Sequence, residues 1–264
     1  MMRYIPEELF EVNRDLKIKI IDLGNGDKAL SIDNFYKNPY DIRNLILNSP
    51  VPMWKNTPDG LNWKEYYDCR HQLGHATSPF SDAMYELISH FFQKEYVILP
   101  YAFISNVFQW IIDQPKNSIG NRVHADGLVE AYDREGKELK EIRYEGTIAA
   151  NIFFNTPDEC HGGTAIYESK LFNSNSIIGH EKDYVDYLEG GEVHRGETGA
   201  QYYDTEWEKF WTIQRILPMA FNRCIMYDGK LFHGAYHVDN NFKDYPRLGQ
   251  ACFMTINPNS GTTP

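Results

Sequence analysis

The chain has few cysteines, no strongly basic segment and no long hydrophobic run. Its four cysteines lack the C-x-x-C spacing of common zinc and redox sites, and a chain of 264 residues is large enough to fold without disulfide bonds. We therefore expect reduced thiols in a cytosolic protein. The cysteines are Cys69, Cys160, Cys224 and Cys252.

Charge and hydropathy exclude two classes of partner. Lys and Arg number 26 against 37 Asp and Glu, a formal net charge of −11, and no segment gathers the basic side chains that a phosphate backbone requires. No stretch reaches the ~18 apolar residues of a membrane-spanning helix. Residues 1–20 also lack the apolar core and small-residue cleavage site of a secretory signal. We expect no nucleic-acid or membrane partner and a cytoplasmic location.

Length and composition are typical of one packed globular domain. Hydrophobic residues make up 42% of the chain and aromatic residues 14%, which excludes a disordered or fibrous protein. We predict a single domain over residues 1–264, with a mixed α/β support region at 1–96 and a β-rich core at 97–257. A polar insertion at 168–205 interrupts this core.

The first hundred residues predict a hairpin followed by helices. Two β-rich runs, 18–23 and 28–33, flank Gly-Asn-Gly-Asp, whose residues tolerate positive φ and suit a tight turn. Asn38 and Pro39 then provide a cap and a proline at the first helical position, which predicts the start of a helix. Apolar residues at i, i+3, i+4, i+7 and i+8 predict an amphipathic helix over 81–94.

From about Val97 the sequence changes to short β-rich runs at regular spacing. Examples are GLVEAYD, GTIAANIFFN, GGTAIYE, RCIMYDG and LGQACFMTI. Such runs predict an antiparallel sandwich or barrel. We therefore expect a mainly β fold with flanking helices.

The insertion at 168–205 is polar and contains several glycines, as in EGGEVHRGETG. It is too long for a tight turn, and we predict that it closes over the site as a lid. A helix is expected after it, from the spacing of four apolar side chains. These are Trp207, Phe210, Trp211 and Leu217.

Three residues of the β-rich region have side chains that bind transition metals. In NRVHADG, His124 and Asp126 are separated by one residue, so on an extended backbone both project from the same face. His233 follows a β-rich run and a glycine turn much later in the chain. Two imidazoles and one carboxylate on one face of Fe(II) leave adjacent positions open for a bidentate 2-oxo acid and dioxygen. We predict that these three residues bind Fe(II).

Arg247 lies fourteen residues after His233, at the head of the β-rich run RLGQACFMTI. A guanidinium group offers a planar fork that matches a carboxylate. We predict that Arg247 holds the far carboxylate of 2-oxoglutarate while the keto-acid end of the cosubstrate chelates the iron.

The order His-x-Asp, then His, then Arg on a following strand resembles the Fe(II)/2-oxoglutarate dioxygenase superfamily, in particular its prolyl-4-hydroxylase-like branch. The likeness covers roughly residues 97–257 and includes AANIFFNTPDECHGGTAIYE and FNRCIMYDGKLFHGAYHV. The first segment is similar to an apolar strand, a turn and a Gly-Gly-Thr that opens the next strand. The second is similar to the strand and turn that deliver the second histidine. The resemblance implies a double-stranded β-helix, a jelly-roll or cupin-like barrel with helices packed on one sheet.

Two features depart from the pattern of that branch. This chain has Phe153 where prolyl hydroxylases often have a cosubstrate-binding tyrosine, and the interval from His233 to Arg247 is longer than usual. Asn151, two residues before Phe153 on the same face, is a substitute candidate for binding the cosubstrate.

Other residues could be mistaken for metal ligands. His237 lies four residues beyond His233, but the glycine turn before His233 favours the earlier histidine. Cys69, His71 and His75 would share one helix face, but no further ligand accompanies them, so we expect a packing or surface role.

The expected activity is hydroxylation of a C–H bond with release of succinate and carbon dioxide. The expected partners are 2-oxoglutarate, dioxygen and a protein or small-molecule substrate, with a prolyl-like peptidyl side chain first by resemblance. Two alternatives remain open, since one fold hosts many functions. One is a non-catalytic jelly-roll binding or structural module, and the other is a cupin-type metal enzyme that does not use 2-oxoglutarate.

Overall fold

The computed structural model describes most of the β-rich region and the helices next to it. Cys69, His71, His75 and His237, which the sequence raised as alternative ligands, lie outside the described residues. The described residues are 7–48, 54–56, 62–64, 79–94, 105–111, 123–132, 139–184, 194–195, 202–203, 207–236, 242 and 244–257.

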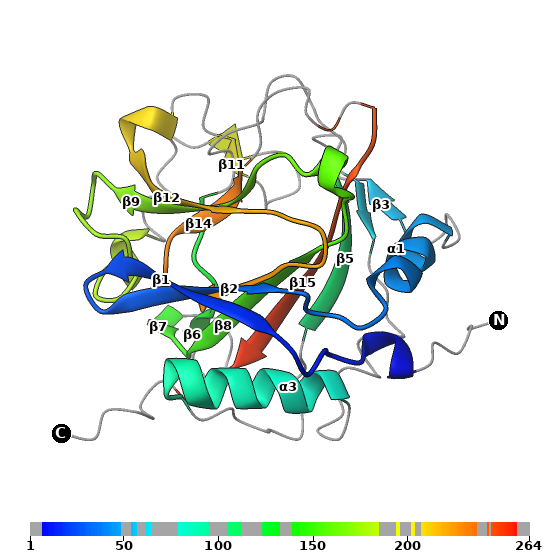
Figure 1. Cartoon of the computed structure of the whole chain (residues 1–264). Coiled ribbons are helices and arrows are strands. Elements are labelled where there is room, and N and C mark those ends of the chain that lie inside the picture. The colour runs from blue at the N-terminus through cyan, green and yellow to red at the C-terminus, as the bar shows by residue number, and fades with distance from the viewer. Residues whose placement is uncertain are drawn as a thin grey trace.

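Two antiparallel β-sheets face each other, and helices cover the outer face of the larger one (Figure 1). Every strand pairing among the described residues is antiparallel, which confirms the predicted mainly β fold with flanking helices. Strands distant in sequence become neighbours in both sheets. The larger sheet has the order β1 (Lys17–Gly24), β2 (Asp27–Asp33), β13 (Cys224–Asp228), β8 (Thr147–Phe153), β15 (Arg247–Thr255), β5 (Ser105–Ile111), β4 (Asn62–Lys64) and β3 (Trp54–Asn56).

The smaller sheet contains three strands, and two further pairs lie outside both sheets. Its central strand β9 pairs with β12 on one side and with β14 on the other. Strand β14 therefore lies in the sheet that faces the larger one. The strands are β12 (Trp211–Pro218), β9 (Gly163–Ser169) and β14 (His233–Tyr236) in the smaller sheet, with β6 (Leu128–Tyr132) paired to β7 (Leu139–Tyr144) and β10 (His194–Arg195) paired to β11 (Tyr202–Tyr203).

Alternation along β8 shows how the larger sheet separates two cores. Ile148, Ala150 and Ile152 pack into the cluster under the helices, whereas Ala149 and Phe153 pack into the cluster between the sheets. Successive side chains of a strand point to opposite faces, so Asn151 also belongs to the face between the sheets. We call this face, with the corresponding side chains of β13 and β15, the inner face.

The N-terminal elements follow the sequence expectation closely. Gly24 and Gly26 have φ near +80°, and they form the turn of the β1–β2 hairpin, where glycine avoids the strain of a left-handed conformation. The Asn38 carbonyl accepts the first helical hydrogen bonds of the helix that begins at Pro39. The helices are η1 (Glu7–Phe10), α1 (Pro39–Asn48), α3 (Pro79–Leu87) with its π-turn η3 (Ile88–Phe92), η4 (Pro157–Glu159) and η5 (Trp207–Lys209).

The apolar stripe of the predicted helix at 81–94 is buried as expected. Met84, Leu87 and Ile88 join the cluster under the larger sheet, and Phe91 and Phe92 pack against it. None of the helices in these described ranges is both long enough and apolar enough to cross a membrane.

The predicted helix over Trp207–Leu217 is wrong. Only the single turn η5 is helical, and Trp211–Pro218 forms strand β12, paired with β9. A bulge between Ile213 and Arg215 explains the misleading pattern. Trp211 and Ile213 belong to the cluster around Tyr167, on the face of the smaller sheet that points away from the larger one, whereas Leu217 joins the cluster between the sheets. The extra residue therefore moves the buried side chains from one face of the strand to the other.

The first part of the predicted lid is packed against the smaller sheet. Ile177 and Tyr184 are buried there, and the amide of Ile177 donates to the carbonyl of Lys230 over 2.9 Å. The amide of Phe232 in turn donates to the carbonyl of Asn175, also over 2.9 Å. Residues 170–184 are therefore structural, and the lid prediction remains for the later part of the insertion, most of which lies outside the described residues.

Candidate metal centre

The three predicted metal ligands meet in the fold. Potential ligand atoms of His124, Asp126 and His233 all lie within 4.8 Å of one another. Nε2 of His233 is 3.2 Å from one carboxylate oxygen of Asp126, and Nε2 of His124 is 3.6 Å from the other. The sequence therefore identified a set of side chains that the chain does bring together.

Backbone pairing explains why these side chains converge. His124 and His233 form an isolated antiparallel bridge, in which each amide donates to the other's carbonyl at 2.9 and 2.8 Å. Two residues further on, the amide of Asp126 donates to the carbonyl of Gly229 over 2.8 Å. The extended backbone places His124 and Asp126 on one side, as the His-x-Asp spacing predicts.

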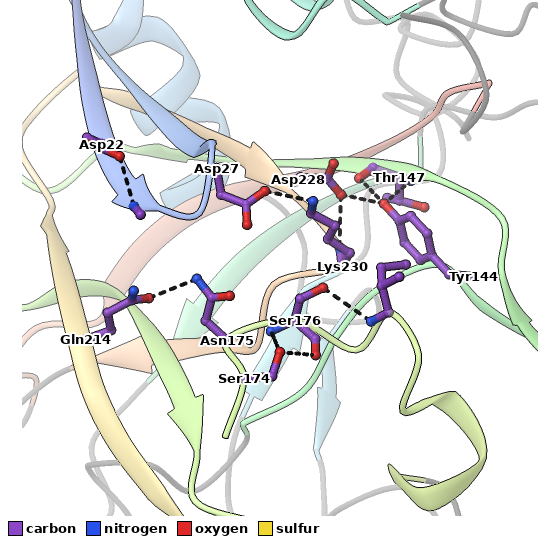
Figure 2. Close-up of polar contacts among 12 residues, drawn as sticks. Asp22, Asp27, Tyr144, Thr147, Ser174, Asn175, Ser176, Gln214, Asp228 and Lys230 are labelled. Atoms are coloured by element: carbon purple, nitrogen blue, oxygen red, sulfur yellow. Dashed lines mark hydrogen bonds and ion pairs between the residues drawn. The ribbon is translucent and has the colours of Figure 1, made fainter. Parts of the chain in front are cut away.

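A polar network outside the ligand set fixes the turn between β13 and β14 (Figure 2). The hydroxyl of Tyr144 donates to Oδ1 of Asp228 over 2.6 Å and accepts the amide of Thr147 at 2.8 Å. Oδ1 of Asp228 also accepts the amide of Lys230 at 3.1 Å, and the amide of Gly229 donates to the carbonyl of Thr147 at 2.7 Å. The turn that precedes His233 is thus bonded to the segment that leads into β8.

Two glycines allow the segments around the ligands to approach closely. A Cβ on Gly127, whose φ is +78°, would lie 2.6 Å from Oγ1 of Thr147. A Cβ on Gly229 would lie 3.0 Å from both Cβ of Asp126 and the carbonyl oxygen of Thr147. Any larger residue at either position would move the ligand segments apart.

A hydrogen bond sets the tautomer of His233. Its Nδ1 lies 2.8 Å from the carbonyl oxygen of Leu231, and because a carbonyl only accepts, Nδ1 must carry the proton. In a neutral ring Nε2 then carries a lone pair that faces Oδ2 of Asp126, a buried oxygen that has no hydrogen-bond partner within the described part of the chain. A lone pair and a carboxylate oxygen 3.2 Å apart repel each other unless a proton on Nε2 or a metal cation lies between them. This arrangement fits a metal site, where a carbonyl commonly orients the coordinating imidazole.

The electrostatics of Asp126 agree with a bound cation. Burial raises the pKa of its carboxyl, but the neighbouring His233 first, then His124, outweigh burial and leave the pKa below its ordinary value. The carboxylate is therefore ionised at neutral pH. The His124 side chain is 46% exposed, compared with 5% for His233, so the group opens to solvent on the side of His124.

Arg247 is a buried cation at the start of β15, on the inner face. Its Nη2 donates to the carbonyl of Gly163 over 3.1 Å, and its Cζ lies 5.2 Å from the ring centroid of Phe153. Among the residues that the structure describes, its Nε has no hydrogen-bond partner and no carboxylate forms an ion pair with it. Burial lowers the pKa of Arg247 to about 10, so the group remains charged at neutral pH, and the described part of the chain offers it no counter-ion.

Asn151 also lies on the inner face, where its amide nitrogen donates to the hydroxyl of Tyr227 over 3.2 Å. Sequence analysis missed Tyr227, a fully buried residue of β13 whose ring packs edge-on against His233, with centroids 4.7 Å apart. The alternation of Ile225 and Tyr227 in RCIMYDG was the signal that could have found it.

Part of the chain is similar to a protein family whose function is unknown. Residues 140–256 match the model of a family described as "Family of unknown function (DUF6445)". Comparisons with curated proteins and with solved structures gave no match. The matched segment contains His233 and Arg247, and the first two candidate ligands, His124 and Asp126, precede it.

Proposed function

We propose that this chain is an Fe(II)- and 2-oxoglutarate-dependent oxygenase. The observation that carries the proposal is the convergence of His124, Asp126 and His233, with the His233 lone pair and a buried carboxylate oxygen directed at each other. Two imidazoles and one carboxylate are the ligand set of non-haem Fe(II) oxygenases, and they leave adjacent positions for a cosubstrate and dioxygen.

Arg247 has no counter-ion among the described residues, which supports 2-oxoglutarate as the cosubstrate. A buried guanidinium without a counter-ion is costly, and a bound carboxylate would remove that cost through charge-assisted hydrogen bonds. Arg247 and Phe153 share the inner face with Tyr227, which packs on His233, so an acid bound to Arg247 would extend toward the metal ligands. A dicarboxylic 2-oxo acid has the two functional groups that this arrangement requires.

The two facing antiparallel sheets support a double-stranded β-helix, the jelly-roll barrel of the 2-oxoglutarate oxygenases. Strand β8 lies between β13 and β15 in the larger sheet, and β14 lies in the smaller sheet. The resemblance to the prolyl-4-hydroxylase-like branch belongs to the same proposal.

Each residue has a defined part in the proposed reaction. His124, Asp126 and His233 hold the metal, and the Leu231 carbonyl keeps the proton of His233 on Nδ1. Arg247 binds the far carboxylate of 2-oxoglutarate, with Asn151 beside it. Bound iron supplies oxidative decarboxylation of 2-oxoglutarate by dioxygen, which yields succinate, carbon dioxide and one oxygen atom inserted into a substrate C–H bond. The apolar side chains of the inner face exclude water from this chemistry.

The substrate approaches from the side of His124, the most exposed of the three ligands. We propose a peptidyl side chain of prolyl type or a small molecule as the hydroxylated substrate. The resemblance suggests this substrate class.

Anaerobic addition of Fe(II) and 2-oxoglutarate tests the proposal. The expected result is the weak visible absorption band of the iron–oxo-acid chelate, followed by succinate formation once oxygen is admitted. His233→Ala is the matched negative control. Iron binding without the band would instead indicate a metal enzyme that does not use 2-oxoglutarate, and no iron binding would indicate a non-catalytic module.

A further inference from the structure

The two histidines of the candidate metal centre are held together by a very short piece of strand pairing. The bridge between His124 and His233 consists of two hydrogen bonds, and the amide of Asp126 adds a third to the carbonyl of Gly229. Two strands that pair over so few residues are marginally stable unless another layer packs against one of their faces. The side chains behind the bridge therefore decide how firmly the ligands stay together.

The side chains behind the bridge point away from the metal ligands and into the cluster around Tyr167. Successive residues of an extended chain project to opposite faces, so Val123 and Ala125 lie behind the two ligands of their segment. Both pack against this cluster, and Phe232, which precedes His233, is fully buried within it. The cluster thus supports both histidine-bearing segments from one side.

One side chain of this cluster, Tyr184, contacts both segments. Its ring lies against the ring of Phe232, with centroids 5.4 Å apart and planes inclined by 48°. Its hydroxyl donates to the carbonyl of Val123 over 3.4 Å. The amide of His124 points at His233, so the Val123 carbonyl of the same peptide unit points to the opposite side, where the Tyr184 hydroxyl meets it. Tyr184 therefore contacts the residue directly before each histidine ligand.

The first half of the 168–205 insertion holds Tyr184 in place. The amide of Tyr184 donates to the carbonyl of His180 over 2.8 Å, and the His180 ring stacks on Phe172 with centroids 5.0 Å apart. Phe172 in turn stacks on Phe232 at 6.1 Å. Tyr184 is 3% exposed, so packing fixes its position. This part of the insertion thus builds the support behind the metal ligands.

We infer that Tyr184 is a positioning residue that clamps the two histidine-bearing segments together and keeps the ligands arranged before the metal binds. The hydroxyl contributes the smaller part, because 3.4 Å is long for a hydrogen bond between two oxygens. Burial of the ring against Phe232 contributes the larger part, since an aromatic side chain buries a large apolar area. The consequence for iron rests on the proposed function, whereas the consequence for the backbone pairing does not.

Amide hydrogen exchange of the metal-free protein tests the clamp. The amides of His124 and His233 are bonded across the bridge, so their exchange rates, taken relative to those of the central strand β8, report local opening. Tyr184→Phe keeps the ring, and we expect it to raise these relative rates about two- to threefold, the lower end of what one hydrogen bond contributes. Tyr184→Ala also removes the ring and should raise them at least about tenfold.

Ile177→Ala is the matched control. Ile177 is buried in the same cluster and belongs to the same half of the insertion, but its amide makes the bond to the carbonyl of Lys230, and alanine keeps that amide. The substitution removes packing of a similar kind. The relative exchange rates of His124 and His233 should therefore match those of wild type.

Competition with a chelator measures the Fe(II) affinity of the same variants. Tyr184→Ala should bind Fe(II) about tenfold more weakly than wild type, because the ligands would no longer be held in one arrangement. Ile177→Ala should bind it as wild type does.

The possible outcomes separate the inference from the proposed function. If the Tyr184 variants open the bridge no more than Ile177→Ala does, the inference is overturned and Tyr184 only fills the cluster. Faster exchange with unchanged Fe(II) affinity would overturn it too, since the ion alone would then set the ligand geometry. If wild type binds no Fe(II), the proposed function fails, and the exchange rates by themselves decide whether Tyr184 clamps the two segments.

Discussion

The Tyr144 hydroxyl donates to Asp228 over 2.6 Å, within the turn that leads to His233. Burial first, then the charge of Asp228, raises the pKa of Tyr144, so the phenol remains a hydrogen-bond donor at all physiological pH values. The carbonyls of this turn hold the amide of Asp126 and orient the ring of His233. The geometry of the candidate metal centre therefore depends on a hydrogen bond that none of the three candidate ligands makes.

We predict that Tyr144→Phe weakens iron binding by about 10- to 100-fold, the range found when groups that support metal ligands are removed. The substitution removes the hydrogen bond of 2.6 Å to Asp228, which keeps only the one from the Lys230 amide, and it takes the acceptor away from the amide of Thr147. Competition with a chelator of known affinity measures the effect.

Lys230→Met is the control for this turn. It breaks the ion pair of 2.7 Å between Lys230 and Asp27 but keeps the Lys230 amide that Asp228 binds. Iron affinity should stay near that of wild type. If Lys230→Met and Tyr144→Phe lost iron affinity equally, any substitution near this turn would weaken iron binding, and Tyr144 would have no particular positioning role.

Removing either histidine of the metal centre should abolish iron-dependent turnover and leave the fold intact. His124 is largely exposed, so alanine there removes a ligand without opening a cavity. His233 is buried against the ring of Tyr227, so alanine there also removes some packing and should lower the melting temperature without unfolding the protein. Iron content after purification and the circular dichroism spectrum report the two effects. His237→Ala, four residues beyond His233, should remain active. Activity retained in His124→Ala or His233→Ala would remove the basis of the assignment.

The part of the site that could be predicted from sequence follows from strand alternation. His-x-Asp on an extended backbone placed His124 and Asp126 together, and the order of later β-rich runs identified His233 and Arg247. Tyr227 was missed because a tyrosine in an apolar strand is usually core. The turn network was missed because Tyr144 and Asp228 are far apart in sequence.

The errors in the fold prediction have local causes. The bulge in β12 broke the period of two, and the aromatic spacing before it resembled one face of a helix. The first half of the 168–205 insertion is polar in sequence, yet its few apolar residues, including Ile177 and Tyr184, are buried by the smaller sheet. Composition alone did not reveal this contact.

Substitutions in the first half of the 168–205 insertion should affect stability, whereas shortening the second half should affect turnover. Ile177→Ala should lower the free energy of unfolding by about 2–5 kcal/mol, because it leaves a cavity in a packed cluster. Replacing residues 186–200 by a short glycine–serine linker should spare the melting temperature and slow substrate turnover. Thermal unfolding and steady-state kinetics of both variants test this. A large loss of stability in the shortened protein would show that the later half is also structural.

Asp228 should make stability depend on pH in a defined direction. Burial raises the pKa of its carboxyl above the value in the unfolded chain, so the folded state binds its proton more tightly. This contribution to stability is fully present below the unfolded pKa and is lost as the pH rises through the folded pKa. The unfolding free energy of wild type, measured relative to that of Asp228→Asn, should therefore decrease as the pH rises from about 4 toward neutrality. Urea unfolding of both proteins across this range measures it, and a difference that is constant with pH would contradict the assignment.

Arg247→Gln should impair 2-oxoglutarate binding much more than iron binding. The amide has neither the charge nor the planar fork of the guanidinium, and each hydrogen bond to a charged group contributes about 1.5–3 kcal/mol. Since about 1.4 kcal/mol corresponds to a factor of ten, the expected loss of affinity is roughly ten- to more than a hundredfold. Titration of iron-loaded protein with 2-oxoglutarate under nitrogen measures it.

Two comparisons show whether Arg247 serves the cosubstrate or the fold. Arg223→Gln removes an arginine that is already paired with Asp33 and donates to the carbonyl of Pro218, and it should leave cosubstrate affinity unchanged. Without cosubstrate, Arg247→Gln should unfold at a temperature no lower than wild type, because it removes a buried charge that has no counter-ion among the described residues. Adding 2-oxoglutarate should then raise the melting temperature of wild type but not of the variant. A variant that is destabilised without cosubstrate yet binds 2-oxoglutarate normally would mean that Arg247 is a structural cation and that another group holds the carboxylate.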